Sequence, residues 1–453
     1  MTVAHMRTRN TGAAVAASCA VILGFTGTAN SQGRPVLASA EEWEEFAVGF
    51  EPNQHSVVPP FDLGRPVEQQ FWKDTVILFK PRSYYLDRDR DTEQDNVGWA
   101  LGGALTYTSG WWKEAVLLSA RVDTSQVLYG PSGKDGTLLF KPGPESFTVL
   151  SEANVTLRVA PGQGLRIGLQ SLNLPYLGSH DIRMVPNTFE GIVLGNKGSI
   201  DVRNYLAYRI GYVSKIKRKN DDEFIPMSEA AGVPGGDDGV AAAALGYILG
   251  DGTRLAATNQ YSFNTFNTLF AKIEHGFSLG EATSLTGYLQ YTDQRSVGDE
   301  LIGEFATYLV SAKAEWKQDD TTLRFGVSTT GEDKGIQKPY GNPANYLSVI
   351  VEDFDRAGED AWMIGVSHDF GRLGGGDLSL FANVVRGNTP DSGPVASPDE
   401  TEYDLTVDYR MKEGWTDTLW FRVRAAYIDE DERTGGDDYF DFRIIVNYSF
   451  DLK

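Results

Sequence analysis

From residue 75 to residue 450 the chain alternates between apolar residues and small or polar residues, one segment after another. In one such segment Trp99, Leu101 and Leu105 share a parity, while glycine, alanine and threonine fill the opposite parity. Alternation with a period of two is typical of β-strands that have one apolar face. About eighteen such segments follow one another, so the pattern predicts an all-β protein.

The connections between the segments alternate between long and short along most of the chain. The long connections are expected at 87–96, 125–146, 174–191, 218–239, 294–303, 330–360, 387–401 and 429–438. A connection near 264–267 is short where the rhythm expects a long one. Outer-membrane barrels typically have short turns at one end and long loops at the other. We therefore predict a transmembrane antiparallel β-barrel of about eighteen strands over residues 75–453.

Hydropathy and charge narrow the class further. Mean hydropathy is below zero, and the body of the chain lacks the run of about 18 apolar residues that a helical membrane bundle needs. The net charge of −21 disfavours a nucleic-acid partner, which requires clustered lysine and arginine. A soluble β-sandwich or propeller is the alternative, but it explains neither the loop rhythm nor the aromatic residues near strand ends.

The first 29 residues predict a secretory signal peptide, because two arginines precede an apolar stretch and a small-residue cleavage site. The chain's one cysteine, Cys19, lies in that stretch, so the mature protein is expected to have no disulfide or thiolate. Residues 30–74 contain prolines and have little periodicity, and we interpret them as a periplasmic N-terminal extension. The expected location is the outer membrane of a Gram-negative bacterium.

If the apolar parity faces lipid, the other parity lines the interior, and that parity is rich in cations. These cations are Arg82, Arg121, Arg158, Arg166, Arg203, Arg209, Lys215, Lys217, Lys272, Lys313, Arg324, Arg410, Arg422, Arg424 and Arg443. The acidic residues concentrate instead in the expected outer loops. One interpretation is a cationic track that lowers the barrier for anions in a narrow pore. The alternative is that each arginine pairs with an inward acid, such as Asp404 or Asp441, and holds the wall together.

Four stretches of the chain resemble the OprD family of outer-membrane porins. They are 81–89 (PRSYYLDRD), 172–191 (LNLPYLGSHDIRMVPNTFEG), 352–362 (EDFDRAGEDAW) and 441–448 (DFRIIVNY). The second stretch is similar to the family's third-loop segment, and the third is similar to its seventh loop and the strand that follows. The resemblance spans nearly the whole mature chain. Two departures are the three residues that follow Phe450 and the unusually acidic outer loops.

The resemblance implies a barrel whose third and seventh loops fold inward and form an eyelet, with an arginine ladder leading through it. The expected ladder consists of Arg82, Arg203, Arg209, Arg410, Arg422, Arg424 and Arg443. Within this set Arg203, Arg209 and Arg410 enter by strand parity alone. The expected constriction-loop residues are Tyr176, Ser179, Asp181 and Arg183. For Asp181 and Arg183 the alternative is that they only brace the loop against the wall.

The leading hypothesis is passive diffusion of small carboxylate-bearing solutes, such as amino acids, peptides or aromatic acids. The alternatives are a porin for neutral oligosaccharides and a loop-mediated surface receptor or adhesin. An enzyme is disfavoured, because His275 and His368 share the lipid-facing parity, His55 lies in the extension, and His180 has no base-orienting neighbour in the sequence. We expect no metal or cofactor. The expected partners are solutes, outer-membrane lipid and lipopolysaccharide, and a monomer is expected, with a loosely associated trimer as the alternative.

Overall fold

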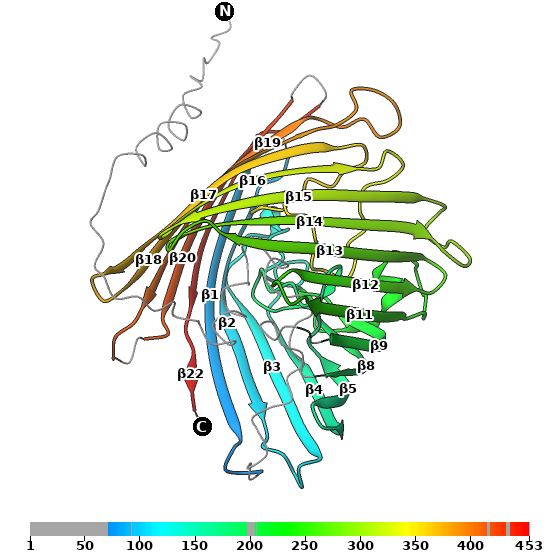
Figure 1. Cartoon of the computed structure of the whole chain (residues 1–453), viewed down its shortest axis with the longest axis vertical. Helices are drawn as coiled ribbons and strands as arrows, with labels where there is room; N and C mark the ends of the chain where they lie inside the picture. Colours follow the sequence, from blue (N-terminus) through cyan, green and yellow to red (C-terminus); the bar gives the residue numbers. More distant parts are fainter. Residues whose placement is uncertain are drawn as a thin grey trace, which may run out of the picture. The chain divides into compact units, whose positions relative to one another are not determined.

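The fold is described from a computed structural model of the chain. It describes residues 71–91, 93–196, 204, 206–414, 417–431 and 435–452. The expected signal peptide at 1–29 and most of the expected extension at 30–74 lie outside these residues. Strands make up most of the described chain (Figure 1). None of the helices among the described residues has the length and apolar character needed to cross a membrane.

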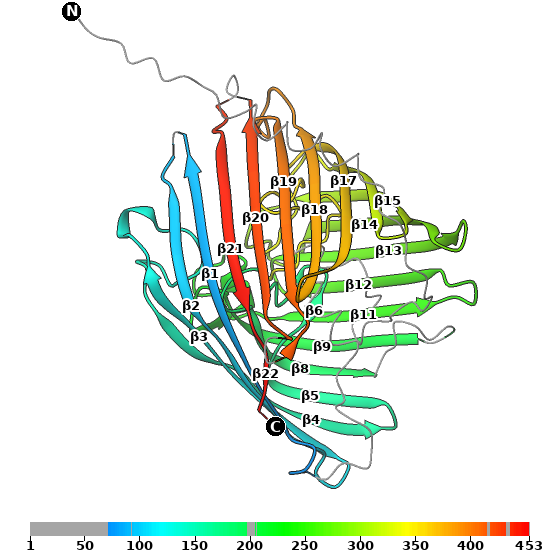
Figure 2. The same ribbon diagram turned by 90° about the vertical axis from the view of Figure 1, so that its left-hand side faces the viewer.

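Long antiparallel strands pair with one another in chain order (Figures 1 and 2). The first half contains β1 (Val76–Arg90), β2 (Asn96–Thr108), β3 (Val116–Tyr129), β4 (Phe147–Ala160), β5 (Gln163–Gln170), β8 (Thr188–Asn196), β9 (Leu206–Lys217), β11 (Val240–Ile248) and β12 (Arg254–Ser262). The second half contains β13 (Phe266–Ser278), β14 (Thr283–Ser296), β15 (Ala306–Gln318), β16 (Thr321–Thr330), β17 (Asp360–Leu373), β18 (Gly376–Asn388), β19 (Glu400–Met411), β20 (Trp420–Glu430) and β21 (Tyr439–Asn447). Because β21 pairs with β1, the sheet closes. The prediction of an 18-stranded antiparallel barrel is confirmed.

Several short elements decorate the barrel. They are η2 (Ser132–Lys134), β6 (Asn173–Leu174), β7 (Leu177–Gly178), β10 (Phe224–Pro226), α3 (Met227–Ala230) and β22 (Phe450–Asp451). The last of these, β22, pairs with the start of β1, and the ring of Phe450 stacks on Phe79 at a centroid distance of 5.9 Å. The residues near Phe450 therefore extend the seam at which the barrel closes.

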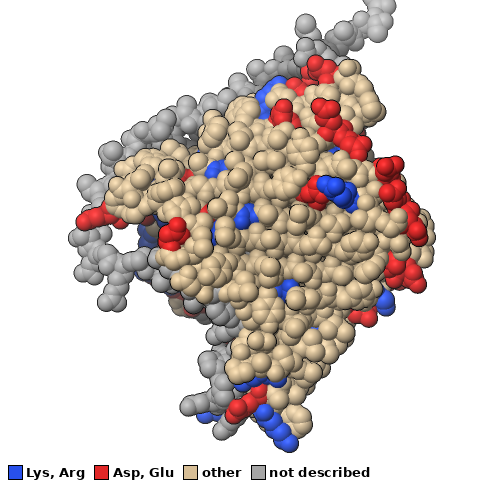
Figure 3. All heavy atoms as spheres, turned by 45° about the vertical axis from the view of Figure 1, so that its right-hand side comes forward, with Lys and Arg blue, Asp and Glu red and all other residues tan. Residues whose placement is uncertain are grey.

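Side-chain exposure shows which parity of each strand faces outward. On β2 Leu101 and Leu105 are 47% and 46% exposed, whereas Ala100 and Ala104 are buried. Successive side chains of a strand point to opposite faces of the sheet, so the apolar parity covers the outside and the other parity lines the interior. Figure 3 shows a broad surface over the strands with few charged side chains, and acidic side chains along one edge. The predicted orientation of the alternating pattern is confirmed.

The connections alternate between long and short as predicted, but the first two outer loops are shorter than expected. The long ones include loop 3 (171–187), loop 4 (218–239) and loop 7 (331–359), and the turn at 263–265 between β12 and β13 is the predicted short exception. The first outer loop is shorter than expected, because β1 continues to Arg90. Polar residues at this end still pair with β21, as the ion pair between Arg88 and Asp441 at 2.8 Å shows. Likewise β3 continues to Tyr129, which shortens the second outer loop.

Candidate functional site

Loop 3 folds into the barrel and crosses its interior. At one end the buried phenol of Tyr176 forms a hydrogen bond with the hydroxyl of Thr292 on β14, at 3.0 Å. At the other end the guanidinium of Arg82 on β1 donates to both carboxylate oxygens of Asp181, at 2.6 and 3.0 Å. The strands β15 to β21 separate β14 from β1 along one side of the ring. Loop 3 therefore spans the lumen, as an inward-folded loop was expected to do.

Loop 7 also lies inside the barrel and is fixed to the wall at two places. The side-chain amide of Gln294 on β14 donates to the carbonyl of Gln337 at 2.9 Å and accepts from its backbone N–H at 2.7 Å. Further along the loop, the carboxylate of Glu402 on β19 accepts the backbone N–H groups of Val351 and Glu352, at 2.9 and 2.8 Å. The loop is therefore fixed to strands on two sides of the lumen.

The two inward loops hold each other through backbone contacts. The N–H of Tyr176 donates to the carbonyl of Asn342 at 2.8 Å, and the N–H of Gly178 donates to that of Tyr340 at 3.1 Å. A Cβ at Gly178 would lie 1.9 Å from the side-chain amide nitrogen of Asn342, so a larger residue here would displace that amide from its hydrogen bonds with Asn173 and Leu174. The expected inward-folded constriction is confirmed, and it is formed by two loops that pack as one unit.

The remaining constriction-loop residues contact protein groups around them. Ser179 donates its backbone N–H to Leu172, and its hydroxyl is buried within the loop. Arg183 donates through Nε to the carbonyl of Thr137, at 2.9 Å, in the outer loop between β3 and β4. Burial, with a smaller contribution from the nearby guanidinium of Arg443, lowers the pKa of Arg183 to about 10. The side chain of Arg183 therefore stays charged at neutral pH while it connects two loops.

The expected ladder residues of β1, β20 and β21 lie side by side on the inner wall. Arg422 and Arg424 are two positions apart on β20, and both are buried. Arg443 on β21 lies directly across from Arg424, and Arg82 on β1 lies across from Asn447. Same-face residues are about 7 Å apart along a strand. The arginines therefore form three successive rungs, with Arg82 at one end, Arg422 in the middle, and Arg424 beside Arg443 at the other end.

Aspartates pair with several of these arginines. The guanidinium of Arg422 donates to both carboxylate oxygens of Asp408, each at 2.7 Å. Arg443 donates through Nε to Asp441 at 2.5 Å. Asp441 is one of the inward acids that the pairing interpretation named. The bidentate contact with Asp408 holds the guanidinium of Arg422 in a fixed orientation.

Two further ladder residues have neutral neighbours. Arg424 donates through Nε to the hydroxyl of Thr406 at 3.3 Å. Arg410 on β19 lies over the ring of Trp420, with its guanidinium carbon 4.5 Å from the ring centroid, and Arg422 lies over the same ring at 4.4 Å. The name arginine wall is used below for the set on β1, β19, β20 and β21. The arginine wall consists of Arg82, Arg410, Arg422, Arg424 and Arg443.

One other predicted ladder residue, Arg209, lies apart from this wall. Arg209 lies on β9, where one terminal nitrogen of its guanidinium donates to the carbonyls of Asn196 and Tyr208, both at 2.7 Å. It contacts the backbone near the turn between β8 and β9. Arg203 lies outside the described residues.

A second group of interior cations lies on β12, β13, β15 and β16. Here a glutamate is shared between an arginine and a lysine, and this arrangement occurs twice. The first trio consists of Arg254, Lys272 and Glu274, with N···O distances of 2.7 and 3.9 Å. The second consists of Lys313, Glu315 and Arg324, with distances of 2.9 and 3.1 Å. This region is called the trio wall below, and each of its trios keeps one positive charge in excess.

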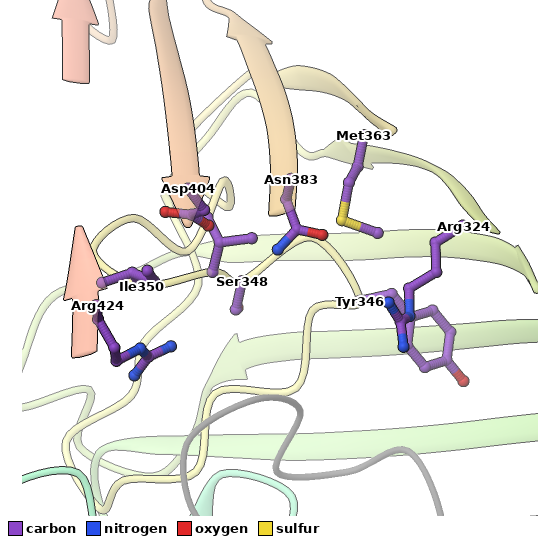
Figure 4. Close-up of a pocket in the computed structure, with 9 residues that line it drawn as sticks. Arg324, Tyr346, Ser348, Ile350, Met363, Asn383, Asp404 and Arg424 are labelled. Atoms are coloured by element: carbon purple, nitrogen blue, oxygen red, sulfur yellow. The ribbon is translucent and has the colours of Figure 1, made fainter. Parts of the chain in front are cut away.

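A small pocket lies between loop 7 and the barrel wall. It is lined by Arg324, Tyr346, Ser348, Val349, Ile350, Met363, Asn383, Asp404 and Arg424. In Figure 4, Arg424 and Arg324 stand on opposite sides of the pocket, with Ser348 and Asn383 between them. The pocket therefore joins the arginine wall to the trio wall at the level of the constriction.

Loop 4 supplies a lumen cation that strand parity did not find. The ammonium of Lys219 lies 3.2 Å from Nδ1 of His180 on loop 3. Burial, and then the positive charge of Arg183, lower the pKa of Lys219 to about 7. Parity cannot place this residue, because it follows the end of β9. The one sequence signal was the basic run at 215–219, KIKRK, which continues past the strand into the loop.

Comparison with known proteins identifies the family. A family model described as outer membrane porin, OprD family, matches residues 69–452. The chain belongs to the OprD family of outer membrane porins. The resemblance found in the four sequence stretches is confirmed. No curated protein matches the chain.

Solved porin structures share the fold of this OprD-family chain. OccK9 (OpdG) of Pseudomonas aeruginosa aligns with a TM-score of 0.75 and 20% identity, covering 85% of this chain and all of that one. OpdK of the same organism, solved with vanillate, has a TM-score of 0.73 and 21% identity over 84% of this chain and 100% of that chain. OccK2 (OpdF) of Pseudomonas aeruginosa, solved in complex with glucuronate, aligns with a TM-score of 0.72 and 21% identity, covering 85% of this chain and 100% of that chain.

Proposed function

We propose that this OprD-family porin passes small carboxylate-bearing solutes by passive diffusion through the eyelet between loops 3 and 7. The solutes are amino acids, peptides, and aromatic or other organic acids. The observation that supports this most is the three-rung arrangement of Arg82, Arg422, Arg424 and Arg443 on adjacent strands. A guanidinium presents paired N–H donors that match the geometry of a carboxylate. A solute can therefore exchange hydration water for a succession of oriented donors.

The narrowing of the lumen by loops 3 and 7 also supports anion passage. Two loops from the same chain fill part of the lumen, and charges in a narrow pore with low-dielectric walls are poorly screened. The relatives are consistent with this proposal, since vanillate and glucuronate, named with OpdK and OccK2, both carry a carboxylate. The activity is proposed to be conduction without catalysis.

The decisive measurement is single-channel conductance in planar bilayers, with reversal potentials in a potassium chloride gradient. The wild-type channel is expected to conduct and to prefer anions. We expect Arg424→Gln to weaken this preference. The triple variant Arg422→Gln, Asp408→Asn and Arg424→Gln is expected to weaken it at least as much, and it removes the Arg422–Asp408 pair as a unit, so neither of these two charges is left without the other. A channel that does not conduct, or whose selectivity is unchanged in the triple variant, would contradict the proposal.

The control is Arg372→Gln, which removes an exposed cation near the turn between β17 and β18. It is expected to leave selectivity unchanged. Swelling of liposomes in monocarboxylates and in disaccharides tests the alternative of a neutral-oligosaccharide porin. Faster swelling in the sugars, with no dependence on Arg424, would favour that alternative. Binding of intact cells by a surface partner that requires the acidic outer loops would favour the receptor alternative.

We also propose that the protein works as a monomer in the outer membrane. The constriction supports this, because loops 3 and 7 of one chain form it together. The mass of the detergent-solubilised protein, measured by light scattering, distinguishes a monomer from the alternative of a loosely associated trimer. Export by the signal peptide and contact of the acidic rim with lipopolysaccharide are further predictions.

A further inference from the structure

We propose that the outer surface of the barrel carries two binding sites for phosphatidylethanolamine headgroups, one at His275 on β13 and one at His368 on β17. In each site the histidine and an aspartate of the neighbouring turn contact the phosphate and the ammonium of one headgroup. This inference concerns the surface that faces the membrane, and it does not depend on which solutes pass through the lumen.

The same contact between a histidine and a threonine occurs twice on the barrel. Nδ1 of His275 lies 2.7 Å from the hydroxyl oxygen of Thr253, and Nδ1 of His368 lies 2.8 Å from that of Thr321. Thr321 begins β16, and Thr253 directly precedes β12. The strand pairs β12–β13 and β16–β17 are separate (Figure 1). One local turn therefore does not account for both contacts.

Both histidines face outward near the periplasmic end of the barrel. Successive side chains of a strand point to opposite faces, and each histidine shares its parity with an exposed phenylalanine two residues later. Phe277 and Phe370 are 50% and 51% exposed, and their rings meet those of His275 and His368 edge to face, at centroid distances of 4.4 and 4.5 Å. Outer-membrane barrels have short turns on the periplasmic side and aromatic girdles at both membrane interfaces. We therefore place the two imidazoles at the level of the lipid headgroups.

One ring nitrogen of each histidine is left for a partner outside the barrel. Nδ1 contacts the threonine, and Nε2 has no hydrogen-bond partner in the part of the chain that the structure describes. An imidazole nitrogen accepts or donates a hydrogen bond according to its protonation. It can therefore pair with the ammonium or with the phosphate of a zwitterionic headgroup.

An exposed aspartate lies on the turn before each threonine. Asp251 precedes Thr253 by two residues, and Asp319 precedes Thr321 by two residues. Asp251 accepts the backbone N–H of Thr253 at 2.9 Å. This hydrogen bond is the largest of the causes that lower the pKa of Asp251, and the nearby ring of His275 is a smaller one. An ionised carboxylate therefore stands close to the imidazole and can bind an ammonium group.

The chemistry of the two sites selects one headgroup. Phosphatidylcholine has the same phosphate, but methyl groups replace the N–H donors of its ammonium, so it cannot donate to a carboxylate. Phosphatidylglycerol has the phosphate without an ammonium. Four strand spacings, about 19 Å, separate β13 from β17, so both sites can be occupied at once.

Native mass spectrometry of the purified barrel, titrated with one lipid at a time, counts the bound lipids. In the wild type we expect two molecules of phosphatidylethanolamine to bind about tenfold more tightly than phosphatidylcholine of the same acyl chains, as one charge-assisted hydrogen bond implies. His275→Gln and His368→Gln are each expected to leave one such molecule. The double variant is expected to bring phosphatidylethanolamine to within about twofold of phosphatidylcholine.

The control is Tyr308→Phe, which removes a hydroxyl from an exposed residue at the other end of the strands. It is expected to keep both sites. Equal binding of phosphatidylethanolamine and phosphatidylcholine to the wild type would overturn the proposal. Equally tight binding of phosphatidylglycerol would show that the phosphate alone is recognised and would also overturn it. The same holds if either single variant loses both molecules, because the sites would then not be separate.

Asp251→Asn and Asp319→Asn keep the test decisive if a histidine variant does not fold. Each keeps the shape of the side chain and removes the charge that attracts the ammonium. We expect each to reduce the preference for phosphatidylethanolamine at its own site by at least threefold. A full tenfold preference at both sites in the double aspartate variant would contradict the assignment of these aspartates.

Discussion

The arginine wall and the trio wall both carry interior cations, but they balance them differently. On the arginine wall an aspartate pairs with one arginine, and Arg422 with Asp408 is the clearest case, through two contacts of 2.7 Å. On the trio wall a glutamate serves two cations, as Glu315 does for Lys313 and Arg324. The first arrangement orients N–H donors without adding net charge, whereas the second leaves one positive charge per trio.

The comparison distinguishes two properties of the interior cations: the orientation of their N–H donors and their excess charge. Orientation of donors determines which solutes are recognised, because a carboxylate needs N–H groups at fixed positions. Excess charge determines which ions are concentrated in the pore, because it sets the local potential. The two walls are therefore expected to contribute differently to the proposed permeation path, and variants can separate the contributions.

The largest expected effect concerns stability. Asp408→Asn leaves the buried charge of Arg422 without its partner and is expected to cost about 3–5 kcal/mol of unfolding free energy. Lys313→Met on the trio wall leaves Glu315 paired with Arg324 and is expected to cost about 1 kcal/mol. Urea unfolding of the refolded barrel in lipid measures both. Equal losses of unfolding free energy would show that a shared glutamate does not reduce the cost of removing one charged partner. The distinction between the two walls would then not hold.

A smaller effect is expected where the arginine wall holds loop 3. Asp181→Asn weakens the charge-assisted contacts with Arg82, which are worth about 1.5–3 kcal/mol, so the loop should leave the wall more often. Single-channel records are expected to show brief additional fluctuations in conductance. Ser179→Ala, in the same loop, is the control, since among the described residues its buried hydroxyl has no hydrogen-bond partner. Records as quiet as those of the wild type would show that Asp181 does not anchor the loop.

The smallest effect is a dependence on pH that arises at Lys219. Lys219 is within electrostatic range of Arg183, Arg443, Asp181 and Asp353, and burial lowers its pKa to about 7. It loses its charge as the pH rises through about 7. The ratio of anion to cation permeability is therefore expected to fall about twofold to threefold between pH 6 and pH 8, since one cation among several is lost.

Lys219→Met is the control for the pH prediction, and its ratio should change less over this range; burial also raises the pKa of Asp355 on loop 7 to about 7, so some dependence on pH remains. His180, the hydrogen-bonding neighbour of Lys219, is kept neutral because burial and the lysine lower its pKa well below the usual value. It should therefore not titrate in the same interval. A ratio that rises with pH, or that falls equally in Lys219→Met, would assign the dependence to another group.

The fold followed from local patterns, and the site followed from them only in part. Strand parity was enough to predict the barrel and the inward face of Arg422, Arg424 and Arg443. It could not predict that Asp408 pairs with Arg422, because that contact depends on the register between β19 and β20. It also could not place loop 7 against Glu402, since a loop of 331–359 has no period that fixes its path. The pocket was missed for the same reason.

The contact between Gly178 and Asn342 has a consequence for how the channel sorts solutes by size. The two loops close against each other through the backbone, and the wall holds them at several points. These contacts form within one chain when it folds in the membrane, before any solute arrives. The size of the largest solute that passes is therefore expected to depend on the sequences of loops 3 and 7.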